Sequence, residues 1–346
     1  MLRRMRTILV TGGAGFIGST FARRVFRDRP DARLLVLDAL TYAGNLSNFD
    51  VEMRDHPRFE FHYGDVNNLT LVDRLVAQSD QVVHFAAESH VGRSIADDRV
   101  FFQTDVMGTQ SVANAVVSHS KRVERFVHIS TSEVYGSAVR EPMDEDHPLL
   151  PASPYAAAKA GADRLVESYL RTYDIPAVLL RPFNNYGPRQ HLEKVVPRFV
   201  TSALLGEPLT LHGGGTAARD WLHVDDCVDG ILATLDAPLA AVRGKTLNLG
   251  TGVATSVAQI ADLVTAAAGR PKLERQTVAE RPGQVARHIA DGRRAKEALG
   301  WEPKTRLKEG IEQTYRWYAD NRAWWEPLRW MRHVRVRTPE GRVELH

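Results

Sequence analysis

A tyrosine and a lysine stand four residues apart in the stretch "SPYAAAKAGAD", as Tyr155 and Lys159. If this stretch is helical, both side chains lie on one face, where the ammonium group lowers the pKa of the phenol by favouring the phenolate. Such a pair can remove a proton from a hydroxyl group while a hydride leaves the same carbon. Thr131 ends an apolar run 24 residues upstream, where its hydroxyl could hydrogen-bond the same substrate oxygen. This tyrosine–lysine spacing is also common in ordinary helices, so the pair alone leaves a purely structural role open.

A glycine-rich loop near the N-terminus indicates what accepts the hydride. "VTGGAGFIGS" places Gly12, Gly15 and Gly18 between an apolar run and a helical pattern. Glycines let the backbone approach a pyrophosphate at the positive end of a helix. Asp38 ends the next apolar run, 20 residues beyond Gly18. A carboxylate there accepts hydrogen bonds from the adenosine ribose and repels a 2′-phosphate, so we predict NAD rather than NADP. Asp65, after the third run, is a candidate for the adenine edge.

These residues sit within a regular alternation of strands and helices. Apolar runs at 6–12, 33–39, 59–65, 81–87, 125–131 and 176–182 alternate with helical patterns at 16–29, 68–78, 98–119 and 154–173. Nearly continuous apolar strands separated by helices predict a parallel sheet covered on both faces. The fold class is therefore a doubly wound α/β fold of the Rossmann type.

The pattern loosens after Arg181. Loops rich in turn formers then separate helical segments at about 194–205, 224–236, 256–268, 292–299 and 307–320. We expect an NAD-binding domain over 1–182, with returns at about 222–250, and a smaller substrate domain made of 183–221 and 251–330. The basic segment 331–346 is expected to be a solvated or packed C-terminal tail.

The composition is that of an ordinary globular protein. The 346 residues are 43% hydrophobic and 25% charged, with a net charge of +3. This near balance gives little support for a polyanionic partner, and we expect no nucleic acid and no metal. The single cysteine, Cys227, excludes an internal disulfide and fits the cytoplasm. Without a run of about 18 apolar residues, no membrane span is expected.

The motifs together resemble the extended short-chain dehydrogenase/reductase family, whose members act on nucleotide sugars. Within it the chain looks most like the dTDP-glucose 4,6-dehydratases. The stretches that carry this likeness follow one another over residues 37–291: "LDALTYAGNL", "HFAAESHVGRSI", "STSEVYGS", "SPYAAAKA", "NNYGPRQHLEKVVPRF", "RDWLHVDD" and "ERPGQVARHIAD". The resemblance implies NAD as the cofactor, a nucleotide-diphosphate sugar as the substrate and a homodimer through a helix pair near 98–119 and 154–173.

The resemblance also implies two sets of binding residues. The NAD set is Gly12, Gly15, Phe16, Ile17, Gly18, Asp38, Asp65, Val66, Ala86, Ala87, Ser89, Thr104, Tyr155, Lys159 and Asn185. The substrate set is Ser89, Thr131, Asn184, Lys194, Val195, Arg219, Asn248 and Arg281. The cationic members of the second set suit a diphosphate because their hydrogen bonds to it are charge-assisted.

Glu133 gains a role from the same resemblance. In the dehydratase cycle the sugar is oxidised at C4, a base removes the C5 proton, hydroxide leaves C6 and the hydride returns to C6. We expect Tyr155 to be the base of the oxidation and Glu133 the base at C5, with Ser132 orienting the C6 oxygen. A 4-epimerase only removes and returns a hydride and needs no such carboxylate.

Three positions depart from the dehydratases that the chain resembles. Ser132 stands where they carry an aspartate that protonates the leaving hydroxyl, Asp105 where an asparagine is usual, and Gly92 where an aspartate is usual. Thr-Ser-Glu is instead the pattern of GDP-mannose 4,6-dehydratases and UDP-glucuronate decarboxylases. We predict an NDP-sugar 4,6-dehydratase, and the alternatives are a UDP-glucuronate decarboxylase, a 4-epimerase and a non-catalytic NAD-binding regulator.

Overall fold

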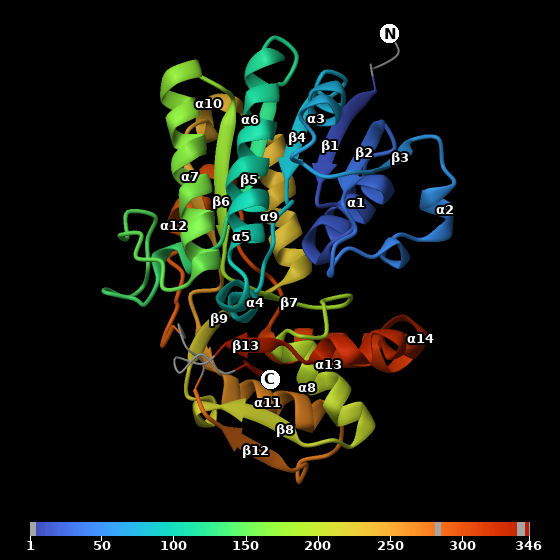
Figure 1. The fold of residues 1–346 in the computed structure, drawn as a ribbon, viewed down its shortest axis with the longest axis vertical. Helices are drawn as coiled ribbons and strands as arrows, with labels where there is room; N and C mark the ends of the chain where they lie inside the picture. The colour runs from blue at the N-terminus through green and yellow to red at the C-terminus, as the bar shows by residue number, and fades with distance from the viewer. Residues whose placement is uncertain (1–4, 281–284, 338–342, 346) are drawn as a thin grey trace.

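A seven-stranded sheet organises the chain (Figure 1). The computed structural model describes residues 5–280, 285–337 and 343–345. All neighbouring strands of the sheet are parallel. Their order is β10 (Thr246–Leu249), β6 (Ala177–Pro182), β5 (Arg125–Ile129), β4 (Gln81–His84), β1 (Arg6–Thr11), β2 (Ala32–Asp38) and β3 (Phe59–Tyr63). The strand order turns back between β1 and β4, which is the arrangement of a doubly wound fold, so the predicted fold class is confirmed.

Helices cover both faces of this sheet. On one face α1 (Phe16–Asp28) packs against α9 (Val224–Asp236), and on the other α6 (Thr109–Ser118) packs against α3 (Leu69–Val76) and α7 (Pro154–Tyr173).

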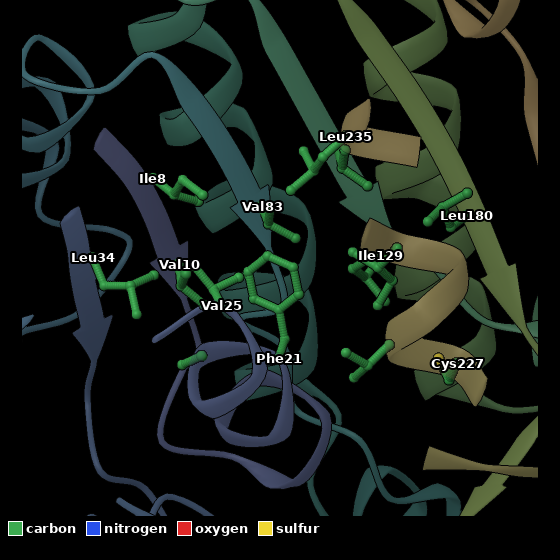
Figure 2. Packing of buried hydrophobic residues seen from close by; sticks show 14 of the residues in the cluster. Ile8, Val10, Phe21, Val25, Leu34, Val83, Ile129, Leu180, Cys227 and Leu235 are labelled. Atoms are coloured by element: carbon green, nitrogen blue, oxygen red, sulfur yellow. The ribbon is translucent and has the colours of Figure 1, made fainter. Parts of the chain in front are cut away.

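Strand β1 shows how the two layers are built. Its alternate residues point to opposite faces, so Ile8 and Val10 join Phe21 of α1 and Cys227 of α9 (Figure 2), whereas Leu9 joins the cluster under α3, α6 and α7. Both faces of the strand are thus buried, which explains its unbroken apolar sequence.

A second, smaller layer lies beyond the carboxyl edge of the main sheet (Figure 1). Its strands are β7 (Asn184–Tyr186), β9 (Ala218–His223) and β11 (Ala254–Ser256) in one sheet, and β8 (Leu209–His212) with β12 (Arg275–Val278) in another. Helices α8 (Val195–Leu205), α11 (Val257–Ala267) and α13 (Leu307–Asp320) pack on one another beside them. In the sequence, α9 and β10 lie between β9 and β11, but they belong to the main layer. The two domain boundaries stay a prediction.

Short elements lie in the connections between these strands and helices. They are η1 (Leu46–Asn48), α2 (Val51–Arg54), α4 (Val91–Ala96), α5 (Arg99–Phe101), η2 (Phe102–Gly108), η3 (Ser132–Tyr135), η4 (Gly213–Gly215), α10 (Leu239–Val242), α12 (Arg293–Leu299) and α14 (Arg322–Trp325). Within the described residues, no helix combines the length and the apolar character needed to cross a bilayer.

The C-terminal segment packs onto the smaller layer and onto α4. After η5 (Glu326–Arg332), strand β13 (Arg335–Arg337) pairs with β14 (Val343–Leu345) and contacts α4. Arg332 is buried, and its Nη1 lies 2.6 Å from Glu207 Oε2. A charge-paired, buried arginine ties this segment to α8 and the loop that follows it.

Candidate active site

A cavity of about 460 Å³ opens at the carboxyl edge of the main sheet, between the two layers. The loops that follow β1, β2, β3, β4, β5 and β6 form one wall, and residues of α8, β8 and β9 form the other. Its volume lies in the range of small-molecule sites. Its position at the point where the strand order reverses is where doubly wound folds bind their ligands.

The glycine loop leaves no room for side chains. Gly12 has a φ of +66°, and a Cβ on it would lie 2.5 Å from the backbone nitrogen of Ala86. A Cβ on Gly18 would lie 2.4 Å from the carbonyl oxygen of Gly12. The bare backbone therefore brings the turn, the first residues of α1 and the loop after β4 together. This cradle fits a pyrophosphate at the N-terminus of α1.

Asp38 holds its carboxylate at the same wall of the cavity. Its Oδ2 accepts a hydrogen bond from Ala14 N at 2.8 Å, and its Oδ1 accepts one from Leu40 N at 2.8 Å. Burial raises the pKa of Asp38, and the two backbone donors act against that rise. A fixed carboxylate at the end of β2 fits two ribose hydroxyls and repels a 2′-phosphate, so these residues fit NAD.

Helix α7 positions the tyrosine–lysine pair. Ser153 caps the helix, accepting from Ala156 N at 3.2 Å, and Pro154 starts it with a φ that suits a first helical turn. Both Tyr155 and Lys159 line the cavity. Lys159 Nζ donates to the carbonyl oxygen of Ile129 at 2.8 Å, which ties α7 to the end of β5.

Thr131 reaches the same point from β5. Its hydroxyl oxygen accepts from Glu133 N at 3.2 Å, and its hydroxyl is hydrogen-bonded to the phenol of Tyr155. Thr131 and Tyr155 therefore meet at the cavity wall that Lys159 also lines.

The pKa of Tyr155 shifts in the direction opposite to the prediction that Lys159 lowers it. In the structure the pKa of Tyr155 is raised, first by burial and then by the negative charge of Asp105, with smaller contributions from Glu133 and Asp163. Only the hydrogen bond from Thr131 acts to lower it among the causes that are resolved. Burial also lowers the pKa of Lys159, against the two carboxylates of Asp105 and Asp163.

Glu133 is the second residue of a short helical turn, η3, that begins at Ser132 after β5. It is half-buried and lines the cavity. Its carboxylate acts electrostatically on Tyr155, on Arg219 of the opposite wall and on His288. Ser132, beside it, is buried and lines the cavity as well. A carboxylate and a hydroxyl are thus presented next to the phenol of Tyr155.

The opposite wall carries cations. Lys194, before α8, donates from Nζ to the carbonyl oxygen of Ser89 at 2.5 Å, across the cavity. Arg219, on β9, is 7% exposed, and burial lowers its pKa against the charges of Glu133 and Glu280. Arg219 is thus buried and Lys194 half-buried, and cations that line a cavity suit an anionic ligand.

Buried amide oxygens at the cavity also lack partners within the described residues. These are Asn184 Oδ1, Asn185 Oδ1 and Gln190 Oε1. An orphaned buried acceptor costs free energy unless a ligand or water satisfies it, so these atoms fit a ligand rich in hydroxyl and amide donors.

Several lining residues were not predicted from the sequence. Arg198 lies one turn after Lys194 in α8, and this four-residue spacing was a usable signal. Tyr42 and Glu193 also line the cavity, and both contact Arg93 behind it. The guanidinium of Arg93 lies 4.0 Å from the ring centroid of Tyr42, and its Nε lies 2.8 Å from Glu193 Oε2. No local pattern indicates this contact, because its three residues come from three separate segments.

The structure brings all but two of the predicted site residues to the cavity wall. Asn248 is a correction. It lies on β10, fully buried, where its Nδ2 donates to Met143 O at 3.0 Å and its Oδ1 accepts from Tyr135 Oη at 2.7 Å. Its amide is used within the core, and it does not line the cavity. Arg281 lies outside the described residues.

A doubly wound sheet whose carboxyl edge joins an NAD cradle to a threonine, a tyrosine and a lysine defines an extended short-chain dehydrogenase/reductase. Comparison with known proteins narrows the class. The sequence model of the family described as GDP-mannose 4,6 dehydratase matches residues 9–314, and the chain belongs to this family. The predictions of an NAD cofactor and of a nucleotide-sugar 4,6-dehydratase are confirmed.

Individual relatives agree with this placement. The chain is 43% identical over 312 residues to the low-salt glycan biosynthesis protein Agl12 of Haloferax volcanii, covering 90% of this chain and 98% of that protein. It is 42% identical over 323 residues to the dTDP-glucose 4,6-dehydratase of Streptomyces griseus, covering 93% and 96%. The crystal structure of the dTDP-glucose 4,6-dehydratase DesIV from Streptomyces venezuelae, with NAD bound, superposes with a TM-score of 0.88 at 42% identity, covering 93% and 100%.

Proposed function

We propose that the chain dehydrates dTDP-glucose to a 4-keto-6-deoxy sugar nucleotide and water, without net oxidation. The observation that carries the proposal is the carboxylate of Glu133 on the same cavity wall as Tyr155. Oxidation and reduction alone need no second base, whereas elimination across C5 and C6 does. The relatives from Streptomyces griseus and Streptomyces venezuelae carry the name of this activity.

Residues of α7 and of the segment after β5 carry out the proton transfer of the oxidation step. Bound on the glycine loop and Asp38, NAD supplies hydride uptake at C4 and its return at C6. Tyr155 takes the proton of the C4 hydroxyl, and Thr131 holds the same oxygen through its hydroxyl. Lys159, one helical turn after Tyr155, holds this part of α7 at the end of β5 through its hydrogen bond to the carbonyl oxygen of Ile129.

Two residues of η3, Ser132 and Glu133, carry out the elimination. The C4 ketone acidifies the C5 proton, and Glu133 removes it. A serine hydroxyl is a far weaker acid than a carboxylic acid, so Ser132 orients the C6 oxygen and the proton passes to it from Glu133. Atoms balance within this step: C5 loses a proton, C6 loses hydroxide, and the two leave as water.

The diphosphate is assigned to the cations of the opposite wall. Lys194 and Arg219 hold it by charge-assisted hydrogen bonds, with Arg198 next to them and Arg281 as a further predicted contact. The unpartnered oxygens of Asn184 and Gln190 accept from sugar and nucleobase donors.

A homodimer is part of the same proposal. Phe102 and Met107 on η2 are 43% and 51% exposed, and η2 packs against α7. Exposed apolar side chains on one member of a packed helix pair favour association with a second copy. Light scattering after size-exclusion chromatography tests this, and charged substitutions at Phe102 and Met107 should yield a monomer. We also propose that the protein works in the cytoplasm, in keeping with its single, buried cysteine.

The test of the reaction is a panel of sugar nucleotides with product masses as the readout. The purified protein is incubated with dTDP-glucose, UDP-glucose, GDP-mannose and UDP-glucuronate, with no added reductant. We expect dTDP-glucose to give a product lighter by one water. An unchanged mass with a changed configuration at C4 indicates an epimerase, and no change in any sugar indicates a non-catalytic NAD-binding protein.

One observation favours a second candidate, a UDP-glucuronate decarboxylase. An aspartate at position 132 beside a C6 carboxylate would add like-charge repulsion, which Ser132 avoids. Loss of carbon dioxide from UDP-glucuronate, with the three hexose nucleotides inert, would replace the dehydratase by this activity.

A further inference from the structure

Asp105 is a buried carboxylate behind the catalytic pair. It lies in η2, a stretch of π-helix, and its side chain is fully buried. Its Oδ1 accepts from Glu88 N at 2.8 Å, while its Oδ2 has no hydrogen-bond partner within the described residues. A π-helical turn inserts an extra residue into a helix and is frequent at functional sites. Here it accompanies a carboxylate that the local hydrogen bonds satisfy only in part.

The groups that face this carboxylate come from two elements. Helix α7 packs on η2 and supplies Lys159 and Tyr155, and the loop after β4 supplies Glu88. The other neighbours add little charge, since α6 contains no charged residue and Arg99 of α5 is exposed. Lys159 is therefore the cation that acts on Asp105, and Tyr155 is the acid on which Asp105 acts in turn.

We propose that Asp105 is a positioning residue of the oxidation step, whose charge makes the proton transfer to Tyr155 depend on pH. It touches neither the sugar nor the cofactor in this scheme and acts through Tyr155 and Lys159. The proposal rests on the proposed role of Tyr155 as the base at the C4 hydroxyl. It goes beyond the proposed function because the dehydration cycle itself requires no carboxylate at this place.

The electrostatic consequence has a definite sign. A negative charge beside Tyr155 and Lys159 raises the pKa of both groups, so removing it lowers both. Burial raises the pKa of Asp105 to about 7, against the attraction of Lys159. As pH rises through that value, Asp105 becomes charged and opposes the ionisation of Tyr155. An asparagine keeps the shape and the bond to Glu88 N but stays neutral.

The experiment is the pH profile of the oxidation step in single turnover. Enzyme with bound NAD is mixed with dTDP-glucose, and the formation of reduced nicotinamide is followed by its absorbance at a series of pH values. For Asp105→Asn we expect the midpoint of the rise in rate to move to lower pH by about one unit or more, the size expected for loss of a neighbouring like charge. The control Asp98→Asn, an exposed aspartate seven residues upstream, should keep the wild-type midpoint.

Each outcome decides a separate question. A midpoint of Asp105→Asn equal to that of the wild type overturns the role of Asp105, even if the rate has changed. Undiminished oxidation by Tyr155→Phe overturns the role of Tyr155 in the proposed function instead. Should Asp105→Asn not fold, Asp105→Ala removes the same charge and must shift the midpoint in the same direction. Should the wild type not oxidise dTDP-glucose, the pH dependence of unfolding of the same variants decides, because it needs no substrate.

Discussion

Replacing Asp105 by asparagine should make the stability of the protein less sensitive to pH. Burial raises the pKa of this carboxyl from its ordinary value of 3.8 to about 7 in the folded protein. The folded state therefore binds the proton more tightly than the unfolded state does. Stability from this group is fully present below pH 3.8, falls as pH rises, and is lost above about pH 7.

The size of the loss follows from the shift. Each unit of pKa difference corresponds to 1.36 kcal/mol, so the shift amounts to about 4 kcal/mol over the whole window. About 3 kcal/mol of it falls between about pH 5 and about pH 8. Asparagine titrates nowhere in this window. The amide NH₂ group of the asparagine takes the place of the unpartnered Oδ2. A buried NH₂ group without a hydrogen-bond partner lowers the stability of the variant by about 1–3 kcal/mol at every pH. The test is therefore how the difference in free energy of unfolding between variant and wild type changes with pH. The size of that difference at a single pH does not decide the question.

Urea unfolding followed by tryptophan fluorescence measures this quantity. Wild type, Asp105→Asn and the control Asp98→Asn are compared at about pH 5 and about pH 8, each free of added NAD. The free energy of unfolding of Asp105→Asn minus that of the wild type should be about 3 kcal/mol more positive at about pH 8 than at about pH 5, because only the wild type loses stability over this range. A difference that is the same at both pH values would show that Asp105 titrates normally, and it would remove the basis for its proposed role in the oxidation step.

Three further substitutions test the site itself. Glu133→Gln should still oxidise C4 and then stall, so reduced nicotinamide should accumulate in single turnover while overall turnover falls about 10²–10⁴-fold; turnover within a few-fold of wild type would contradict the assignment of the C5 base. Ser132→Ala should keep C4 oxidation and slow elimination by only about 10-fold, the worth of one neutral hydrogen bond; complete loss of elimination in a product-mass assay would make Ser132 the proton donor. Asp38→Ala should weaken NAD and narrow its advantage over NADP in equilibrium binding, because the ribose bonds and the repulsion of a 2′-phosphate are both removed; unchanged NAD retention after purification would place the ribose elsewhere.

The main sheet could be predicted from the sequence because its strands are buried on both faces. Their apolar runs, such as 33–39 against the observed Ala32–Asp38, are then bounded by polar residues at both ends. The helical pattern at 98–119 was less informative. It contains α5, η2 and α6 in succession, and the change to π-helix at Phe102–Gly108 leaves the apolar periodicity largely intact. Sequence periodicity detects that a face is apolar but not one additional residue within a turn.

The site was predictable where it follows strand ends and not where separate segments meet. Asp38 and Thr131 follow directly from the carboxyl ends of β2 and β5, which share one edge of the sheet. Asn248 was assigned wrongly because the likeness places the residue on a strand but does not give the direction of its side chain, which points into the core. The ion pair of Arg93 with Glu193 depends on the approach of the segment before α8, which no local pattern describes.

The direction of the Tyr155 pKa shift also depends on contacts between separate segments, which sequence spacing does not reveal. Sequence spacing pairs Tyr155 with Lys159 because both lie on one helix, and from that pair alone a lowered pKa follows. In the folded chain the pKa of Tyr155 is instead raised, first by its burial and then by the negative charge of Asp105 on η2. Compared with the pattern of the dehydratases that the chain resembles, an acidic group is missing at Ser132 and present at Asp105. The site has therefore exchanged a carboxyl group beside the sugar for one behind the catalytic pair. In the proposed cycle, elimination then draws its proton from Glu133, and the oxidation that precedes it is the step that we expect to respond to pH.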